Sequence, residues 1–133
     1  MSKLILCLLL LFNIYVCTDT PQHRIFTQDD TANELNVRFG EEFYLKLKTN
    51  PSTGYSWTFL NQAEIDDTLT LLRTYSENPQ LNSEKPLIGA GGFRYYHFKA
   101  VKKTKEPVSI KLSYSKSYIS SNSPTTTFKV NVN

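Results

Sequence analysis

The side chains that could carry out chemistry are few in this chain of 133 residues, which has two histidines, His23 and His97, and two cysteines, Cys7 and Cys17. Histidine and cysteine are the usual general bases, nucleophiles and transition-metal ligands. No cysteine and no obvious carboxylate partner lies near His97 in the sequence, so we expect this histidine to be structural. No catalytic set, metal site or cofactor motif is predicted, and we do not expect the chain to be an enzyme.

Paired acids and a basic run offer two further kinds of site. The aspartates at 29–30 and 66–67 are adjacent, and neighbouring side chains on a strand or turn usually point apart into water. The basic run at 102–105 falls in an expected turn. Lys and Arg number 15 against 12 Asp and Glu, a formal charge of +3 that is spread along the chain. Because nucleic-acid binding needs a concentrated basic footprint, we do not expect a nucleic-acid partner.

The N-terminus has the pattern of a secretory signal peptide. Lys3 precedes an apolar run over residues 4–16, which is shorter than the roughly 17–25 residues of a spanning helix. Small residues at the end of the run predict a cut after Thr18, so residues 1–18 are expected to be removed and residues 19–133 to form one domain. A retained membrane anchor is the alternative, against which the length of the run argues.

Removal of this segment would take both cysteines with it, because they lie before the expected cut. The mature domain would then have no thiol and no disulfide, although it enters an oxidising route. We expect it to be secreted or kept in vesicles or lysosome-like compartments, with no membrane association after the segment is removed.

Alternation of apolar and polar residues predicts a β-rich domain. The expected strands cover residues 24–27, 35–39, 42–49, 55–60, 69–75, 92–101, 107–115 and 125–132. A helical turn over residues 61–67 is the only helix expected. All six prolines fall between these runs or at their starts, where strands tolerate them. Many short strands separated by turns predict an all-β sandwich or barrel.

Three connections of an antiparallel sandwich would meet at one end. Alternate connections emerge together, which groups residues 50–54, 76–91 and 116–124, as in the recognition loops of immunoglobulin variable domains. The connections at 61–68 and 102–106 belong to the opposite end. Four of the five glycines, Gly54, Gly89, Gly91 and Gly92, lie in or beside two of the three loops. Turn geometry explains any one glycine, but their concentration favours binding at this end.

The first loop has the sharpest motif, Asn50-Pro51-Ser52-Thr53-Gly54-Tyr55, followed by Trp57. The proline fixes its own φ and pushes the asparagine into an extended conformation, and the glycine permits a tight return. Two small hydroxyl side chains form the tip. Such a loop is stiff, narrow and polar, so it loses little entropy on entering a cleft. We expect the tryptophan to lie in the core.

With this motif the chain resembles the chagasin-type inhibitors of papain-like cysteine peptidases. The loops of that family read Asn-Pro-Thr-Thr-Gly-aromatic, Gly-x-Gly-Gly and Arg-Pro-Trp. The first is present here with one serine in place of threonine. The second is complete as Gly89-Ala90-Gly91-Gly92, and the third is altered to Lys116-Ser117-Tyr118.

The resemblance implies an immunoglobulin-like β-sandwich that acts as a reversible, non-covalent inhibitor and occludes the peptidase cleft with its three loops. The tip at Ser52 and Thr53 would approach the catalytic residues of the enzyme. Gly89–Gly92 would run beside the cleft like a substrate strand, and Lys116 and Tyr118 would rest on the opposite rim. The partner would be a papain-like cysteine peptidase of the same organism or of a host. A monomer suffices for this, and no cofactor is implied.

The third loop departs from the family pattern at Ser117, where the proline is missing. A freer loop costs more to order, and lysine lacks the planar fork of arginine, so we expect this loop to contribute less than in relatives. The rival hypothesis is a secreted β-sandwich binding or adhesion module for a carbohydrate or protein ligand. A flat, exposed aromatic platform would favour that rival.

Overall fold

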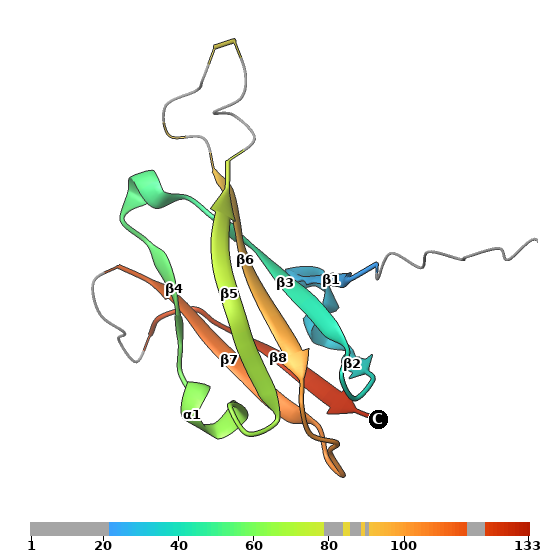
Figure 1. Cartoon of the computed structure of the whole chain (residues 1–133). Helices are drawn as coiled ribbons and strands as arrows, with labels where there is room; N and C mark the ends of the chain where they lie inside the picture. Colours follow the sequence, from blue (N-terminus) through green and yellow to red (C-terminus); the bar gives the residue numbers. More distant parts are fainter. Residues whose placement is uncertain (1–21, 79–83, 86–88, 90, 117–121) are drawn as a thin grey trace, which may run out of the picture.

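Two four-stranded sheets pack face to face in the computed structural model, which describes residues 22–78, 84–85, 89, 91–116 and 122–133 (Figure 1). The strands are β1 (Arg24–Thr27), β2 (Glu34–Val37), β3 (Glu42–Thr49), β4 (Ser56–Phe59), β5 (Leu69–Glu77), β6 (Gly92–Ala100), β7 (Val108–Ser115) and β8 (Thr125–Val132). The first sheet has the order β1-β3-β6-β5 and the second the order β2-β8-β7-β4. This arrangement confirms the predicted all-β sandwich, and every expected strand is present, three with the predicted bounds and the others shifted by one or two residues.

Alternating side chains of both sheets fill the space between them. Strand β3 contributes Phe43, Leu45 and Leu47, all fully buried, while its intervening residues face outward. Phe43 stacks on Phe98 of the neighbouring strand with ring centroids 5.7 Å apart. Strands β7 and β8 of the second sheet contribute the facing core side chains, which are Ile110, Leu112, Phe128, Val130 and Val132. The domain is therefore held by apolar packing, and residues 22–133 contain no cysteine that could add a disulfide.

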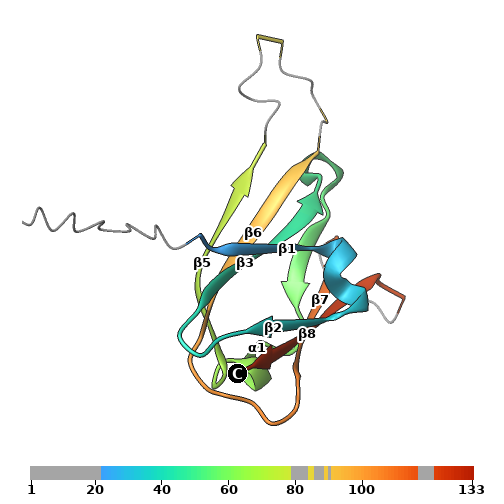
Figure 2. The same cartoon turned by 90° about the vertical axis from the view of Figure 1, so that its right-hand side faces the viewer.

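Two edge pairings are parallel, which the sequence did not reveal. β1 pairs with β3 and β2 pairs with β8 in parallel, and the remaining pairings are antiparallel. A 3-10 helix, η1 (Gln28–Ala32), carries the chain from one sheet to the other (Figure 2). Thr27 caps it, and the Thr27 amide donates to the Asp30 carboxylate at 2.6 Å. This helix was not expected, and Asp30 turns back to the backbone rather than toward water.

The two ends of the sandwich differ in content. The loop after β3 lies at one end, and a one-turn helix, α1 (Gln62–Ile65), lies at the other with the turn that holds the basic run 102–105 (Figure 1). Trp57 is only half-buried and packs against the core instead of lying within it. Among the described residues, no helix is long and apolar enough to cross a membrane.

Candidate functional site

The first loop is a closed turn held by its own hydrogen bonds. Residues Pro51–Thr53 form a second short 3-10 helix, η2, which was also not expected. The carbonyl of Asn50 accepts from both the Thr53 amide, at 3.1 Å, and the Thr53 hydroxyl, at 2.6 Å. Gly54 follows with a φ of 78°, a left-handed conformation that supplies the expected tight return. Ser52 and Thr53 are exposed at the tip, so the loop presents hydroxyl groups on a constrained backbone.

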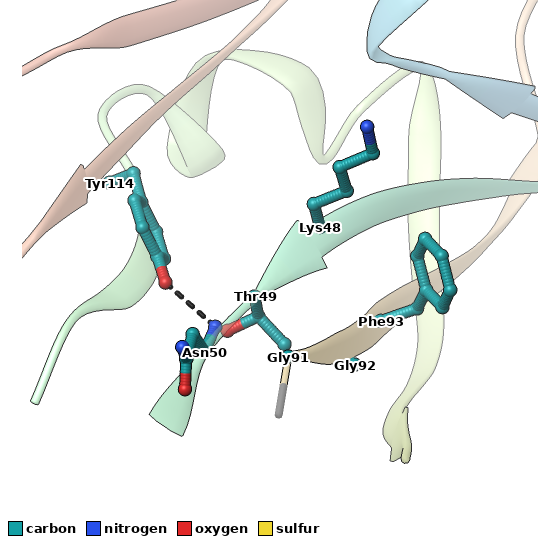
Figure 3. A pocket seen from close by; sticks show the side chains of 7 residues that line it. All are labelled: Lys48, Thr49, Asn50, Gly91, Gly92, Phe93 and Tyr114. Carbon is teal, nitrogen blue, oxygen red and sulfur yellow. Dashed lines mark hydrogen bonds between the residues drawn. The ribbon is translucent and has the colours of Figure 1, made fainter. Parts of the chain in front are cut away.

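Asn50 joins this loop to the second loop and to the strand that leads into the third. Its side-chain amide donates to the carbonyl of Gly89 at 3.1 Å. Its backbone amide donates to the Tyr114 hydroxyl at 2.8 Å, the bond drawn in Figure 3. The Ser52 hydroxyl donates to the side-chain oxygen of Asn50 at 2.6 Å. The sequence placed Asn50 in the binding motif with an extended backbone, whereas the hydrogen bonds that make it the junction of the site are seen only in the structure.

The second loop needs glycine because its backbone passes close to other chain segments. A Cβ atom on Gly92 would lie 2.4 Å from the carbonyl oxygen of Glu77, and one on Gly91 would lie 3.2 Å from that of Thr49. Gly89 has a φ of 83°. The close approach explains two of the glycines, and the backbone conformation explains the third. Ala90 lies outside the described residues.

The base of the third loop contacts the first loop through aromatic rings. The ammonium group of Lys116 lies 5.5 Å from the centre of the Tyr55 ring, a cation–π distance. The ring of Tyr114 also contacts the first loop and β4, with its centroid 5.4 Å from that of the Tyr55 ring and 4.8 Å from that of the Trp57 ring. The Trp57 indole donates to the carbonyl of Lys48 at 2.8 Å. Ser117 and Tyr118, the other predicted residues of this loop, lie outside the described residues.

A hollow of about 350 Å³ lies where these segments meet (Figure 3). Its lining residues are Lys48, Thr49, Asn50, Gly91, Gly92, Phe93 and Tyr114. The lining offers backbone groups, aromatic rings and one ammonium group, with no carboxylate or imidazole among these residues. It can therefore hold a partner's side chain or main chain, but it has no acid–base pair. Sequence reasoning missed Tyr114, whose position directly before the third loop was the available signal.

The structure corrects one expectation about His97. A carboxylate partner exists, because the His97 Nε2 atom lies 2.9 Å from a carboxylate oxygen of Glu42. His23 lies 3.9 Å from the same oxygen. Burial lowers the pKa of His97 below its ordinary value, although the Glu42 hydrogen bond opposes the shift. These three residues lie toward the other end of β3 from Asn50, so they are no part of the loop site.

Comparison with known proteins identifies the family. Residues 36–132 match the chagasin family of peptidase inhibitors. The chain belongs to this family. Members of the family are peptidase inhibitors and not enzymes, which confirms the expectation that this chain is not an enzyme. The family match also confirms the resemblance seen in the loop motifs.

Individual relatives agree with this assignment. The chain is 28% identical over 75 residues to chagasin of Trypanosoma cruzi, an alignment that covers 56% of this chain and 66% of chagasin, just under two thirds of its length. The crystal structure of the cysteine protease inhibitor EhICP2 from Entamoeba histolytica is similar, with a TM-score of 0.67 and 25% identity over 85% of this chain and 99% of that one. The solution structure of Amebosin has a TM-score of 0.56 and 26% identity, covering 84% of this chain and 98% of that one. The immunoglobulin-like sandwich is thus the fold that this chain shares with its relatives.

Proposed function

We propose that this chain is a reversible, non-covalent inhibitor of papain-like cysteine peptidases that occludes the active-site cleft with three adjacent loops. The observation that carries the proposal is the set of hydrogen bonds of Asn50, which ties the first loop to Gly89 and to Tyr114. Loops that are joined before binding lose less conformational entropy when they enter a cleft. Because the chain belongs to a family of peptidase inhibitors, we infer that these joined loops bind a peptidase.

The tip of the first loop would block the catalytic residues without being cleaved. A peptidase binds a substrate as an extended strand, whereas Pro51–Thr53 form a 3-10 turn whose ends are fixed by hydrogen bonds. Attack on a peptide bond in this turn would require the turn to open. The exposed Ser52 and Thr53 are small enough to approach the enzyme's nucleophile, so the turn fills the place of the scissile bond without supplying one.

The second and third loops would hold the inhibitor on either side of the tip. Three of residues 89–92 are glycine, and without a side chain a backbone can come close enough to the edge of a cleft for main-chain hydrogen bonds. Lys116 and Tyr55 form an aromatic–cationic pair beside the tip, and such side chains are frequent interface anchors. The partner that fits these features is a peptidase of the same organism or of a host, and one copy of the chain suffices.

The rival, an adhesion module for carbohydrate, has less support. Aromatic rings do gather on the outer face of the first sheet, where Tyr75 and Tyr95 stack 4.8 Å apart and Lys46 lies 4.1 Å from the Phe93 ring. However, Tyr95 is only 6% exposed, and Tyr75, which is 39% exposed, has one face of its ring stacked on Tyr95. A sugar-binding platform would need those faces open to solvent.

We also propose that residues 1–18 are removed during secretion and that residues 19–133 are the mature domain. The support is the apolar run of the sequence, which ends before the first strand begins at Arg24. The mass of the protein recovered from the medium of a eukaryotic secretion host tests this. We expect the chain to begin at residue 19, and recovery of the full chain from the membrane fraction would contradict the proposal.

Titration of papain with the purified protein tests the inhibitory function, with trypsin as the control enzyme. We expect selective inhibition of papain at nanomolar concentration, or about −12 kcal/mol of binding free energy. Activity should return on dilution, and the inhibitor should be recovered with unchanged mass. Full papain activity at micromolar inhibitor would overturn the proposal. Equal inhibition of trypsin would show that the inhibition is not specific for cysteine peptidases.

A further inference from the structure

Three potential metal ligands meet on the outer face of the first sheet, outside the loop site. The ligand atoms of His23, Glu42 and His97 all lie within 4.8 Å of one another. His23 and Glu42 are partly exposed, and the His97 side chain is about nine-tenths buried. The cluster therefore has one buried imidazole and two groups that solvent can reach.

The strand register brings these residues together. The parallel pairing of β1 and β3 sets Arg24 opposite Phe43, so His23, one residue earlier, lies beside Glu42. The antiparallel pairing of β3 and β6 sets Tyr44 opposite His97, which makes Glu42 and His97 diagonal neighbours on one face. Each ligand comes from a different one of three adjacent strands or their ends, so the backbone holds the cluster in place.

Aromatic packing orients the two imidazole rings. His97 stacks on Tyr44 with centroids 4.3 Å apart and an interplanar angle of 15°, and His23 meets Tyr44 edge-on at 5.7 Å. The Nδ1 atom of His97 is buried and has no hydrogen-bond partner among the described residues. The 2.9 Å distance to Glu42 is that of Nε2, so Nε2 is the atom that would bind an ion shared with Glu42, and Nδ1 would remain without a partner.

We propose that His23, Glu42 and His97 bind one zinc ion, with a water molecule as the fourth ligand. Two imidazoles and one carboxylate are a ligand set that zinc accepts. Tetrahedral coordination with bonds of about 2.0–2.2 Å places ligand atoms about 3.3 Å apart. The His97–Glu42 and His23–Glu42 distances, 2.9 and 3.9 Å, lie on either side of that value. Side-chain rotations therefore suffice to assemble the site.

The ion would fasten the N-terminal strand to the centre of the first sheet. His23 directly precedes β1, whose four residues pair only with β3. Because residues 22–133 contain no cysteine, a metal clamp would take the place of a disulfide at this edge. An ion that binds only the native state raises the unfolding temperature.

One cationic side chain near the site, that of Arg73, opposes zinc binding, and its replacement gives a further test of the site. The Arg73 guanidinium donates to the Tyr44 hydroxyl at 3.3 Å, so it lies beside the ring on which His97 stacks. Its positive charge would repel a divalent ion, although the exposed side chain can move toward solvent. Arg73→Gln should therefore bind zinc more tightly than the wild-type protein.

Calorimetric titration of the purified, metal-free protein with Zn²⁺ tests the proposal. We expect one equivalent to bind with a micromolar or lower Kd, together with a higher unfolding temperature. His23→Gln and Glu42→Gln should each weaken binding at least about tenfold, because each removes one of three ligands. Glu106→Gln is the matched control, since Glu106 is exposed in the turn after β6.

Two results would overturn the zinc site. One is no binding at millimolar Zn²⁺, and the other is wild-type affinity in both His23→Gln and Glu42→Gln, which would place the ion elsewhere. His23 and Glu42 are partly exposed, so these variants remain informative if His97→Gln does not fold. Papain inhibition has no part in the measurement, so its outcome is separate from that of the proposed inhibitory function.

Discussion

The loop end and the outer face of the first sheet use different chemistry on one scaffold. Around Asn50 the described residues present hydroxyls, amides, glycines and aromatic rings, joined by hydrogen bonds that involve side chains. Around Glu42 the described residues present two imidazoles and a carboxylate on paired strands. The first region suits recognition of a protein by shape, and the second suits coordination of an ion. A β-sandwich can thus separate the two tasks, because one lies in the loops at its end and the other lies on its paired strands.

The largest expected effect comes from a bulky charge at the loop tip. Thr53→Arg should raise the inhibition constant for papain by at least about 100-fold, because a large cation cannot enter the space of the scissile bond. The sandwich should stay folded, since Thr53 is exposed, and the variant also removes the hydrogen bond from the Thr53 hydroxyl to the Asn50 carbonyl. The readout is the inhibition constant together with the unfolding temperature.

The matched control places the same substitution at a distance from the loops. Thr70 is an exposed residue of β5, where it pairs with Lys99 at the opposite end of the strand from the loops. Thr70→Arg should leave inhibition unchanged. Similar inhibition constants for the two variants would show that the loop tip is not part of the interface with papain.

A smaller effect is expected when the junction between the loops is cut. Asn50→Ala removes the side-chain hydrogen bonds to Gly89 and from Ser52. A net loss of about 0.5–1.5 kcal/mol for each bond predicts inhibition weakened by about tenfold. Asn36→Ala, which removes a surface contact with Asn131, is the control. An unchanged inhibition constant for Asn50→Ala would show that the loops need no prior connection.

Restoring the family pattern in the third loop should strengthen inhibition. The triple variant Lys116→Arg, Ser117→Pro and Tyr118→Trp stiffens the loop and adds a planar guanidinium and a larger ring. We expect the inhibition constant for papain-like enzymes to fall by a few-fold, about 1 kcal/mol. No gain against any enzyme of a panel would contradict the view that this loop is weakened.

The smallest effect concerns the start of β1, close to the histidine cluster. Burial would raise the pKa of Glu41, but hydrogen bonds from the Arg24 side chain, at 2.6 and 3.1 Å, and from the Arg38 backbone outweigh it and lower the pKa. A carboxylate whose pKa is lowered in the folded state stabilises the fold at pH values above its ordinary pKa. That stability is lost as the pH falls through the lowered pKa.

Glu41→Gln should therefore reduce the free energy of unfolding at neutral pH by less than about 1 kcal/mol and flatten its decline below about pH 4.5. Urea unfolding at several pH values gives this difference. An identical pH profile in the two proteins would show that the Arg24–Glu41 contact adds no stability.

The strands and the loop end could be predicted because their signals are local. Alternation in β3, β7 and β8 follows the side-chain period of a strand, and the Asn50–Tyr55 motif lies within six consecutive residues. The order of the strands then groups the loops at one end. What escaped prediction within this region was the hydrogen bonding of Asn50 and Tyr114, which are 64 residues apart.

The histidine cluster could not be predicted because it depends on register. His23, Glu42 and His97 are widely separated in sequence, and Glu42 lies in a run with no feature that marks it as a ligand. Only the parallel pairing of β1 with β3 and the diagonal placement across β3 and β6 unite them. The same parallel pairing was absent from the predicted antiparallel sandwich. Neither the parallel pairing of the edge strands nor the candidate metal site could therefore be predicted from local sequence patterns, because both depend on non-local strand pairing.

Occupation of the peptidase cleft is the central claim, and a binding measurement with blocked papain tests it most directly. Papain is first bonded covalently to a peptidyl inhibitor that fills its cleft, and the affinity of this chain for blocked and free enzyme is then compared by calorimetry. The account predicts nanomolar binding to free papain and at least about a thousandfold weaker binding to the blocked enzyme, a loss of about 4 kcal/mol. Equal affinity for the two forms would contradict it, because the loops would then bind papain outside its active-site cleft.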